Sequence, residues 1–539
     1  MMDSASVVDL CETIFHPKKL VAIALCGPHA CECASTHDPL DILVVAEPLP
    51  TGVRFRKLKV GGLTVCFLAV GKPLFESDVR RAMLGDTATV KLLTPYRALR
   101  GREYLREMEV KFKCRRILET LNDLAAEYPE TVVELLIDPR YFPLRDARLL
   151  SKTYPPLRGL FSRVFRSDMG LKMTLRGYLE ALRVVEKKGL VEFVDGAVRP
   201  TRKLVSKATA RLRSPSFVRL FDRAFKNIVV RGFTGQVSLM DLSSEIVKAF
   251  KSLPSGGPEP LEDPNRYITL PTGEVTTVEE EVRKVLEEGV SPPSSMTGIG
   301  GILNVVYLAD VRTDGVKRVV VKKFQDWYGF KWFPIALWTA GVRSFALRGS
   351  SRLDREYSMT ILLRRHGIPV PNVIHVDLER KALVKEYVEG ETLSAYIREF
   401  FKGSAEDLGG LIPQTADIMA RAHSIDVTLG DCKPDNFLVS RERRVFFVDL
   451  EQASKGGERA WDVAEFLYFS CHHAPPTTPP ERVSKFARFF ARSYLEAGGD
   501  LKALRRAAGI RFLRPFTILA LPHFLVTASK ACLEVCECG

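Results

Sequence analysis

LGDCKPDN, residues 429–436, is followed by the apolar run VFFV at residues 445–448 and then by Asp449. This order places two carboxylates and one amide, those of Asp431, Asn436 and Asp449, around a loop and a short hairpin. Phosphoryl transfer needs one carboxylate to orient or receive the hydroxyl proton and oxygen ligands to hold magnesium on the phosphates. The stretch therefore predicts a phosphotransfer site. The alternative is two unrelated acidic turns that flank a core strand.

The order Asp-x-Lys-Pro-x-Asn, a hairpin and a strand-end Asp resembles the catalytic loop and metal-binding turn of the protein kinase superfamily. The resemblance implies that Asp431 is the catalytic carboxylate and that Lys433 is the lysine of the loop. It also implies that Asn436 and Asp449 hold Mg²⁺ or Mn²⁺ on the phosphates of ATP.

Three glycines, Gly298, Gly300 and Gly301, precede a predicted strand and suit a loop whose backbone N–H groups approach phosphate oxygens. Such a loop is a weak signal alone, because plain hairpins also contain it. The next strand, RVVVKKF, resembles the kinase strand whose lysine holds the α and β phosphates. We predict that Lys322 is this lysine, with Lys323 as the alternative in the other register.

A carboxylate must orient that lysine, and Glu356, at the start of an amphipathic helix, fits this role. Asp354 is a poorer candidate, because it lies two residues away and on another helical face. A helix that only displays surface charges is the alternative. The later run LVKEYVEGE resembles the hinge between kinase lobes, where backbone groups near Glu386 and Val388 would meet adenine.

Departures from the protein-kinase pattern bear on regulation and on the acceptor. Leu429-Gly430 stands in place of His-Arg, and the metal turn is Asp449-Leu450-Glu451 in place of Asp-Phe-Gly, so control by activation-loop phosphorylation is not expected. Only twelve residues separate Asp449 from Asp462, which looks like the structural aspartate of the larger lobe. This compact arrangement resembles RIO kinases, the small kinase of the archaeal KEOPS complex, lipopolysaccharide kinases and aminoglycoside phosphotransferases. The Lys-Pro pair favours the protein-kinase side.

Near the start of the chain, residues 20–25 and 41–46 are predicted strands joined by a glycine turn and a polar loop. The pattern resembles the nucleotidyltransferase fold, in which a Gly-Ser turn precedes an Asp-x-Asp pair that holds two magnesium ions. Asp41 takes the place of the second Asp, but Pro39 replaces the first and Pro28 replaces the serine.

The following strand, residues 63–68, carries no carboxylate where the third metal ligand is expected. We therefore predict a degenerate nucleotidyltransferase-like domain that serves docking or scaffolding. Asp38 is the residue that could replace the lost ligand and sustain residual transferase activity.

The middle of the chain is predicted to be helical. Apolar residues recur at helical spacing over residues 102–128, and a second helix is expected to be capped by Thr174 and ended by Gly189. A hairpin follows at residues 190–198, with its turn at Asp195-Gly196. Helix followed by hairpin is typical of a winged-helix module.

A basic segment, residues 197–231, overlaps that hairpin and holds ten basic residues against one acidic residue, Asp222. Such a segment can neutralise nucleic-acid phosphates in a salt-sensitive way. The alternative is a solvated basic face that binds an acidic protein surface or nothing.

Composition bounds the remaining possibilities. With 46% hydrophobic and 27% charged residues and a net charge of +14, the 539 residues are typical of a soluble globular protein with several domains. The sequence contains no apolar run long enough to span a membrane and no secretory signal at its start, so we expect a cytoplasmic protein with reduced cysteines.

We therefore predict an α+β multidomain protein. Its parts are a nucleotidyltransferase-like α/β domain at 1–100, a helical and winged-helix region at 101–252, a linker at 253–295 and a bilobal protein-kinase-like domain at 296–539. The predicted function is that of an atypical, archaeal-style serine/threonine protein kinase that transfers the γ-phosphate of Mg·ATP. The alternatives are a small-molecule kinase of the aminoglycoside or choline class, and a tRNA-associated or other nucleic-acid-associated ATPase with a kinase fold.

Overall fold

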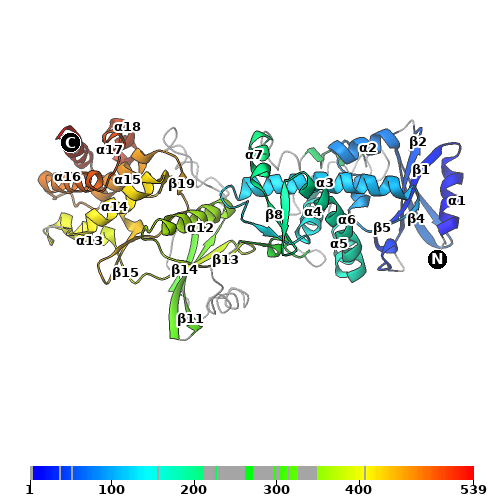
Figure 1. Cartoon of the computed structure of the whole chain (residues 1–539), viewed down its shortest axis with the longest axis horizontal. Helices are drawn as coiled ribbons and strands as arrows, with labels where there is room; N and C mark the ends of the chain where they lie inside the picture. The colour runs from blue at the N-terminus through cyan, green and yellow to red at the C-terminus, as the bar shows by residue number, and fades with distance from the viewer. Residues whose placement is uncertain are drawn as a thin grey trace. The chain divides into compact units, whose positions relative to one another are not determined.

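The structure of the protein is a computed structural model that describes residues 4–35, 38–49, 52–153, 157–211, 222–223, 225–227, 230, 261–270, 297–298, 304–313, 315–325, 349–405 and 408–538. Helices and several sheets make it a mixed α+β protein, as predicted. Contacts divide the chain into two compact units (Figure 1). The first consists of Met1–Ala126 and Val132–Leu270, and the second of Glu127–Thr131 and Pro271–Gly539.

The first unit begins with a five-stranded sheet in the order β3-β4-β2-β1-β5. Its strands are β1 (Lys19–Cys26), β2 (Leu40–Glu47), β3 (Val53–Val60), β4 (Leu63–Gly71) and β5 (Tyr96–Arg100). β2 and β4 run parallel, and the other neighbours run antiparallel. The predicted strands at 20–25, 41–46 and 63–68 are thus present as β1, β2 and β4.

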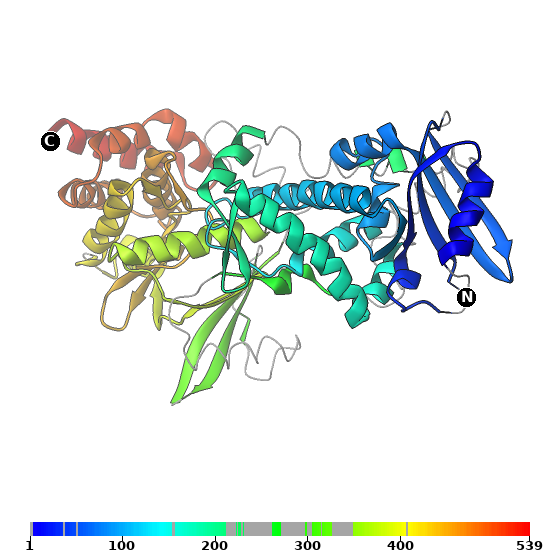
Figure 2. The same cartoon turned by 45° about the vertical axis from the view of Figure 1, so that its right-hand side comes forward.

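Helices cover both faces of this sheet, with α1 (Ser4–Phe15) on one face and α2 (Lys72–Arg81) on the other in the views of Figures 1 and 2. Val7, Cys11 and Phe15 of α1 pack against every second residue of the central strands, because alternate side chains of a strand point to the same face. Two short 3₁₀ helices, η1 (Gly27–Ala30) and η2 (Thr89–Leu92), follow β1 and α2.

The rest of the first unit is mainly helical. The helices whose bounds are described there are α3 (Arg102–Glu127), α4 (Tyr141–Thr153), α5 (Leu157–Arg166), α6 (Asp168–Lys187), α7 (Arg202–Arg211) and the 3₁₀ helix η3 (Pro264–Tyr267). The predicted cap at Thr174 is wrong, because α6 begins six residues earlier, after Ser167, whose hydroxyl accepts the N–H of Gly170 at 3.2 Å. Thr174 lies inside the helix and donates its hydroxyl to the Gly170 carbonyl at 2.8 Å.

After α6 the chain forms the predicted hairpin. Its strands β7 (Val191–Val194) and β8 (Ala197–Pro200) belong to a small sheet with β6 (Leu136–Ile137) and β9 (Ile268–Thr269), in the order β7-β8-β6-β9. Asp195 and Gly196, at the turn, have φ angles of +49° and +84°, which suit a two-residue hairpin turn.

The second unit starts with a five-stranded sheet in the order β10-β11-β12-β14-β13 and one long helix, together called the smaller lobe. These elements are β10 (Thr297–Gly298), β11 (Asn304–Thr313), β12 (Gly315–Phe324), α12 (Gly349–Arg365), β13 (Val373–Asp377) and β14 (Ala382–Glu386). Figure 2 shows β11 and β12 as a long hairpin.

The larger lobe follows and holds the largest apolar core. It contains β15 (Gly390–Thr392), α13 (Leu393–Lys402), α14 (Leu411–Ser424), β16 (Val427–Thr428), η5 (Pro434–Asn436), β17 (Phe437–Ser440), β18 (Val445–Phe447), β19 (Ser454–Lys455), α15 (Arg459–His472), α16 (Pro480–Glu496), α17 (Leu501–Ala507), α18 (Ile510–Leu513), η6 (Arg514–Ile518) and α19 (Pro522–Cys538). Within the described ranges, no helix has the length and apolar character needed to cross a membrane.

A buried cluster of charges on α3 organises the helical part of the first unit. The guanidinium of Arg116 donates to Asp146 at 2.9 Å and to Glu119 at 3.2 Å, and it lies 3.6 Å from Asp86. Asp146 also accepts the hydroxyl of the buried Tyr178 at 2.6 Å. Buried charges are tolerated only when they are paired in this way.

We predict that Arg116→Met lowers the free energy of unfolding of the first unit by about 3 kcal/mol or more, because buried carboxylates lose their counter-charge. Urea denaturation measures this change. The control is Arg80→Met, which removes an exposed ion pair with Glu76 and should cost less than about 1 kcal/mol. Equal stability of the two variants would contradict the structural role of the cluster.

Candidate active site

The alternation of β12 places the side chain of Lys322 in the interior of the second unit. Val319 and Val321 belong to a small apolar cluster on one face of the sheet, whereas Lys322 and Val320 share the other face. β12 is bordered by β11 and β14, which hold it on both edges. Lys322 is 7% exposed. Lys323, the candidate if the strand had the other register, is half-buried and lies on the face of the apolar cluster.

Three carboxylates surround the Lys322 ammonium. Its Nζ lies 2.7 Å from Glu356 of α12, 2.8 Å from Asp449 and 3.1 Å from Glu451. Burial alone would lower the pKa of Lys322, but the charges of Asp449, Glu356 and Glu451 raise that pKa well above its usual range. The lysine is therefore held as a cation.

Glu356 and Asp354 face different surroundings, although both are fully buried on α12. Asp354 accepts hydrogen bonds from the backbone N–H groups of Glu130 at 2.9 Å and Thr131 at 3.1 Å, and from the Thr131 hydroxyl. These contacts anchor α12 and leave Glu356 as the partner of Lys322.

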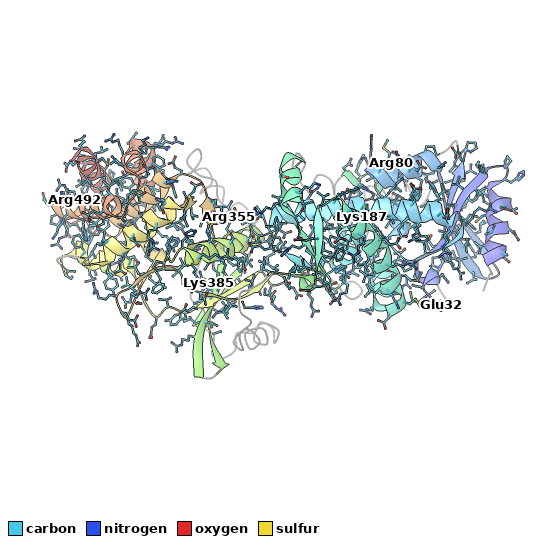
Figure 3. The ribbon with its side chains drawn as sticks, in the orientation of Figure 1. Glu32, Arg80, Lys187, Arg355, Lys385 and Arg492 are labelled. Atoms are coloured by element: carbon cyan, nitrogen blue, oxygen red, sulfur yellow. The ribbon has the colours of Figure 1, made fainter. Side chains whose placement is uncertain are left out.

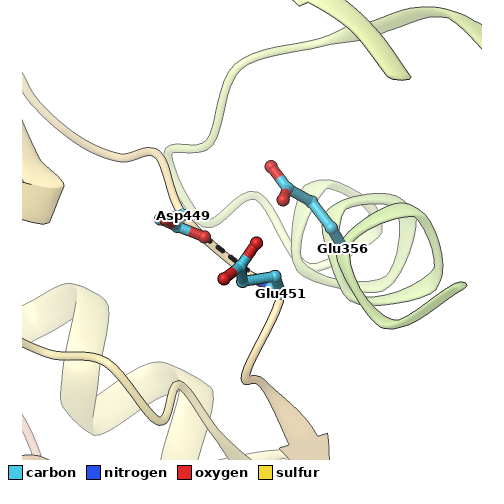
Figure 4. A group of neighbouring side chains, drawn as sticks. All are labelled: Glu356, Asp449 and Glu451. Carbon is cyan, nitrogen blue, oxygen red and sulfur yellow. Dashed lines mark hydrogen bonds between the residues drawn. The ribbon is translucent and has the colours of Figure 1, made fainter. Parts of the chain in front are cut away.

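The turn Asp449-Leu450-Glu451 follows the hairpin of β17 and β18. Burial would raise the pKa of Asp449, but the nearby charges of Lys322, Lys433 and Lys385 lower it to about 2. Among the described residues, one group of three acidic side chains, Glu356, Asp449 and Glu451, has ligand oxygens within 4.8 Å of one another (Figure 4). Carboxylate oxygens are the donors that Mg²⁺ prefers, so Asp449, the most exposed of the three, fits such an ion, while Glu356 and Glu451 also contact cations of the protein.

Asp431 lies on a loop that is fixed by helix α15. Asp462 accepts the backbone N–H groups of Leu429 at 2.6 Å and Gly430 at 2.8 Å, and it also lies 3.0 Å from the imidazole of His423. One turn later, Glu465 accepts the N–H of Cys432 at 2.7 Å. Two carboxylates from one helical face thus hold the loop through its backbone.

Gly430 has a φ of +86°, a conformation that glycine adopts without strain. The next residue, Asp431, is half-buried, and its carboxylate accepts a hydrogen bond from Lys433 at 2.8 Å. Asn436 donates its amide to the Asp431 carbonyl at 2.7 Å, so its side-chain oxygen is directed elsewhere. Burial would lower the pKa of Lys433, but Asp431 raises it above the usual range.

The structure thus brings together Lys322, Glu356 and Asp449, which were predicted as site residues, and it places Lys433 and Asn436 against Asp431. Gly298 lies in β10 opposite Tyr307, whereas Gly300 and Gly301 lie outside the described residues.

At the predicted hinge, the Glu386 N–H donates to the carbonyl of Asn372 at 2.9 Å, and the Glu386 side chain is exposed. Val388 is half-buried between β14 and β15.

Sequence reasoning missed three residues of the charge cluster, Arg352, Lys385 and Glu451. Lys385 donates to Glu356 at 2.8 Å, and Figure 3 shows it beside α12. Arg352, fully buried, lies 3.3 Å from Glu451. One signal was available for Lys385, because it interrupts the apolar strand ALVKE as Lys322 interrupts RVVVKKF.

The two candidate metal ligands of the first unit form ion pairs with cations of the protein itself. Asp41, on β2, forms an ion pair with Lys91, and Asp38 lies 2.6 Å from Arg163. The residue of β4 opposite Asp41 is Cys66, which is consistent with the expected lack of a third carboxylate.

Most basic residues of the segment 197–231 that the structure describes have partners within the chain. Arg223 pairs with the buried Asp86 at 3.4 Å and Arg199 with Glu192 at 2.7 Å. The ammonium of Lys226 lies 2.7 Å from Asp222, and that of Lys203 donates to the Lys188 carbonyl at 2.8 Å. Arg213, Arg219 and Arg231 lie outside the described residues.

Comparison with known protein families points to the same part of the chain. Residues 306–479 match the model of the lipopolysaccharide kinase (Kdo/WaaP) family. A similar protein is the "Probable bifunctional tRNA threonylcarbamoyladenosine biosynthesis protein" of Methanocaldococcus jannaschii, 27% identical over 126 residues. This match covers 23% of the chain and only 22% of the length of that relative. The family match supports an ATP-dependent kinase domain and leaves the acceptor open.

We predict that Asp462→Ala lowers the unfolding free energy of the second unit by about 3 kcal/mol or more, because two backbone N–H groups and His423 lose a buried acceptor. Urea denaturation measures the change. Glu399→Ala is the control, since its ion pair with Lys402 is exposed. A loss below about 1 kcal/mol for Asp462→Ala would show that α15 does not hold the loop.

Proposed function

We propose that the second unit is an atypical protein kinase that transfers the γ-phosphate of Mg·ATP to a serine or threonine hydroxyl. The observation that carries this proposal is the position of Lys322, 2.7 Å from Glu356 and 2.8 Å from Asp449. A buried lysine between a helix carboxylate and a strand-end aspartate is the arrangement that positions a triphosphate in kinases.

In this proposal Asp431 orients the acceptor hydroxyl and accepts its proton. Lys433, whose Nζ lies 2.8 Å from that carboxylate, supplies positive charge beside the transferred group. Asp462 and Glu465 keep the loop in place through its backbone, so that Asp431 needs little reorganisation.

The nucleotide would be held by the smaller lobe and the metal turn. Lys322 would contact the phosphates while Glu356 orients it, and Gly298, Gly300 and Gly301 would offer backbone N–H groups. The hinge at Glu386 and Val388 would receive adenine through backbone groups.

Asn436 and Asp449 would hold Mg²⁺ or Mn²⁺, which when bound neutralises phosphate charge. The low pKa of Asp449 keeps it ionised, and thus able to bind a cation, throughout the physiological range.

A small-molecule acceptor is the second candidate. Between Asp449 and the start of α15 at Arg459 the described chain forms only a turn and the two-residue strand β19, which is little platform for an extended peptide. The matched family is described as a lipopolysaccharide kinase family, which is a kinase named for an acceptor other than a protein. A tRNA-associated ATPase is the third candidate, because the similar protein of Methanocaldococcus jannaschii is named for tRNA threonylcarbamoyladenosine biosynthesis.

For the first unit we propose a degenerate nucleotidyltransferase-like domain followed by a winged-helix region. Lys91 and Arg163 support this view, because they pair with Asp41 and Asp38, the two carboxylates that a metal would need. Arg223, Arg199 and Lys226 each have a partner within the chain, which favours a structural role for these three basic residues over nucleic-acid binding.

We expect Asp431→Ala to lower phosphotransfer from labelled ATP by about 10²-fold or more, because the acceptor hydroxyl loses its base. Lys322→Met should lower it similarly, and removal of Mg²⁺ should abolish it. Autophosphorylation and transfer to protein, small-alcohol and tRNA acceptors are measured side by side.

Lys323→Met is the matched control, one residue along the same strand, and should keep wild-type activity. Phosphate transfer to small alcohols only would overturn the proposal that the acceptor is a protein. Salt-sensitive tRNA binding with ATP hydrolysis and no transfer would favour the third candidate. Undiminished autophosphorylation of Asp431→Ala would exclude the catalytic role of this residue.

A further inference from the structure

Lys385 is a second buried lysine beside Lys322. It lies on β14 directly opposite Val320 of β12, and Lys322 is two residues further along β12. Residues paired across two strands, and residues two apart on one strand, point to the same face of a sheet. The two lysines therefore share one face, and Lys385 is only 4% exposed.

The contacts of Lys385 join three elements. Its Nζ donates to Glu356 Oε1 at 2.8 Å and to the Val448 carbonyl at 2.8 Å. Lys322 takes the other oxygen, Oε2, of the same carboxylate at 2.7 Å. Lys385 thereby connects β14 and α12 with the residue immediately before Asp449.

The cluster holds a second cation for two of the three carboxylates that contact Lys322. Glu356 also contacts Lys385, and Glu451 also contacts Arg352 at 3.3 Å. Asp449, the third carboxylate, is the proposed metal ligand and is the most exposed, with 27% of its side chain accessible. If the Lys322 ammonium moved to a phosphate, neither Glu356 nor Glu451 would become an unpaired buried charge, which is strongly unfavourable.

We propose, on the basis of the function proposed above, that Lys385 is a positioning residue that holds Glu356 and the Val448 carbonyl when Lys322 turns from Glu356 to the triphosphate. Lys385 acts through Glu356 and the metal turn and does not contact the nucleotide. Its loss affects mainly the ATP-bound state, because in the free protein Glu356 still has Lys322.

The test compares Lys385→Met, Lys385→Arg and Lys402→Met in the full chain. Calorimetric titration gives the Kd of each variant for Mg·ATP and for adenosine, which has no phosphate. Lys385→Met should weaken the binding of Mg·ATP, with a Kd about tenfold higher or more. This change corresponds to the free energy that one charge-assisted hydrogen bond contributes. Its adenosine affinity should stay within about twofold, since adenosine does not draw Lys322 away from Glu356.

Lys385→Arg keeps the charge and should recover most of the Mg·ATP affinity. Lys402→Met, which removes an exposed lysine of the larger lobe, should bind both ligands like the wild type. If Lys385→Met does not fold, Lys385→Gln, which keeps a donor without a charge, should show the same selective loss.

If Lys385→Met lost affinity for Mg·ATP and for adenosine equally, Lys385 would have only a structural role, and the proposal would be overturned. Unchanged Mg·ATP affinity in Lys385→Met would overturn it as well, while the proposed function would stand. Phosphotransfer that survives in Lys322→Met and is lost in Lys385→Met would assign phosphate binding to Lys385 itself and contradict the positioning role. A wild-type protein that does not bind Mg·ATP would overturn the proposed function and this role together.

Discussion

The burial of the Lys322 ammonium is the constraint on which the second unit depends. A lysine that is 7% exposed is stable as a cation only when carboxylates surround it. The carboxylates come from α12 and from the turn after β18, so strand, helix and turn must meet at one point. Asp354 anchors α12, and Asp462 anchors the loop of Asp431. These contacts hold the helix and the loop in position around Lys322.

The two units use carboxylates in opposite ways. In the first unit Asp41 and Asp38 are each paired with a cation of the protein, Lys91 and Arg163, and Cys66 faces Asp41 where another ligand would be needed. In the second unit the shared cation, Lys322, has three carboxylate partners, two of which have another cation besides. In the proposed function the second arrangement releases its lysine to a ligand, whereas in the first unit Asp41 and Asp38 are each held by a cation of the protein.

Local patterns predicted much of this structure. Alternation and turn residues located β1, β2, β7 and β8, and the motif order located the residues that gather around Lys322 and Asp431. The start of α6 was misplaced, because Thr174 has the side chain of a capping residue but bonds back within the helix, and Ser167 caps instead.

Pairings between residues far apart in the sequence were beyond this reasoning. Nothing in the local sequence shows that Arg352 meets Glu451 or that Arg223 meets Asp86, since each pairing depends on the packing of separate elements. The basic segment illustrates the consequence, because its charge can be counted from the sequence, but the number of charges already neutralised cannot.

Labelling with an acyl-phosphate derivative of ATP tests the central claim most directly, because this reagent acylates the lysine that lies beside its phosphates. Mass spectrometry of the digested protein should find the label on Lys322, dependent on Mg²⁺ and suppressed by excess ATP. Label confined to exposed lysines, or label on Lys322 that ATP does not suppress, would contradict a triphosphate site formed by Lys322, Glu356 and Asp449.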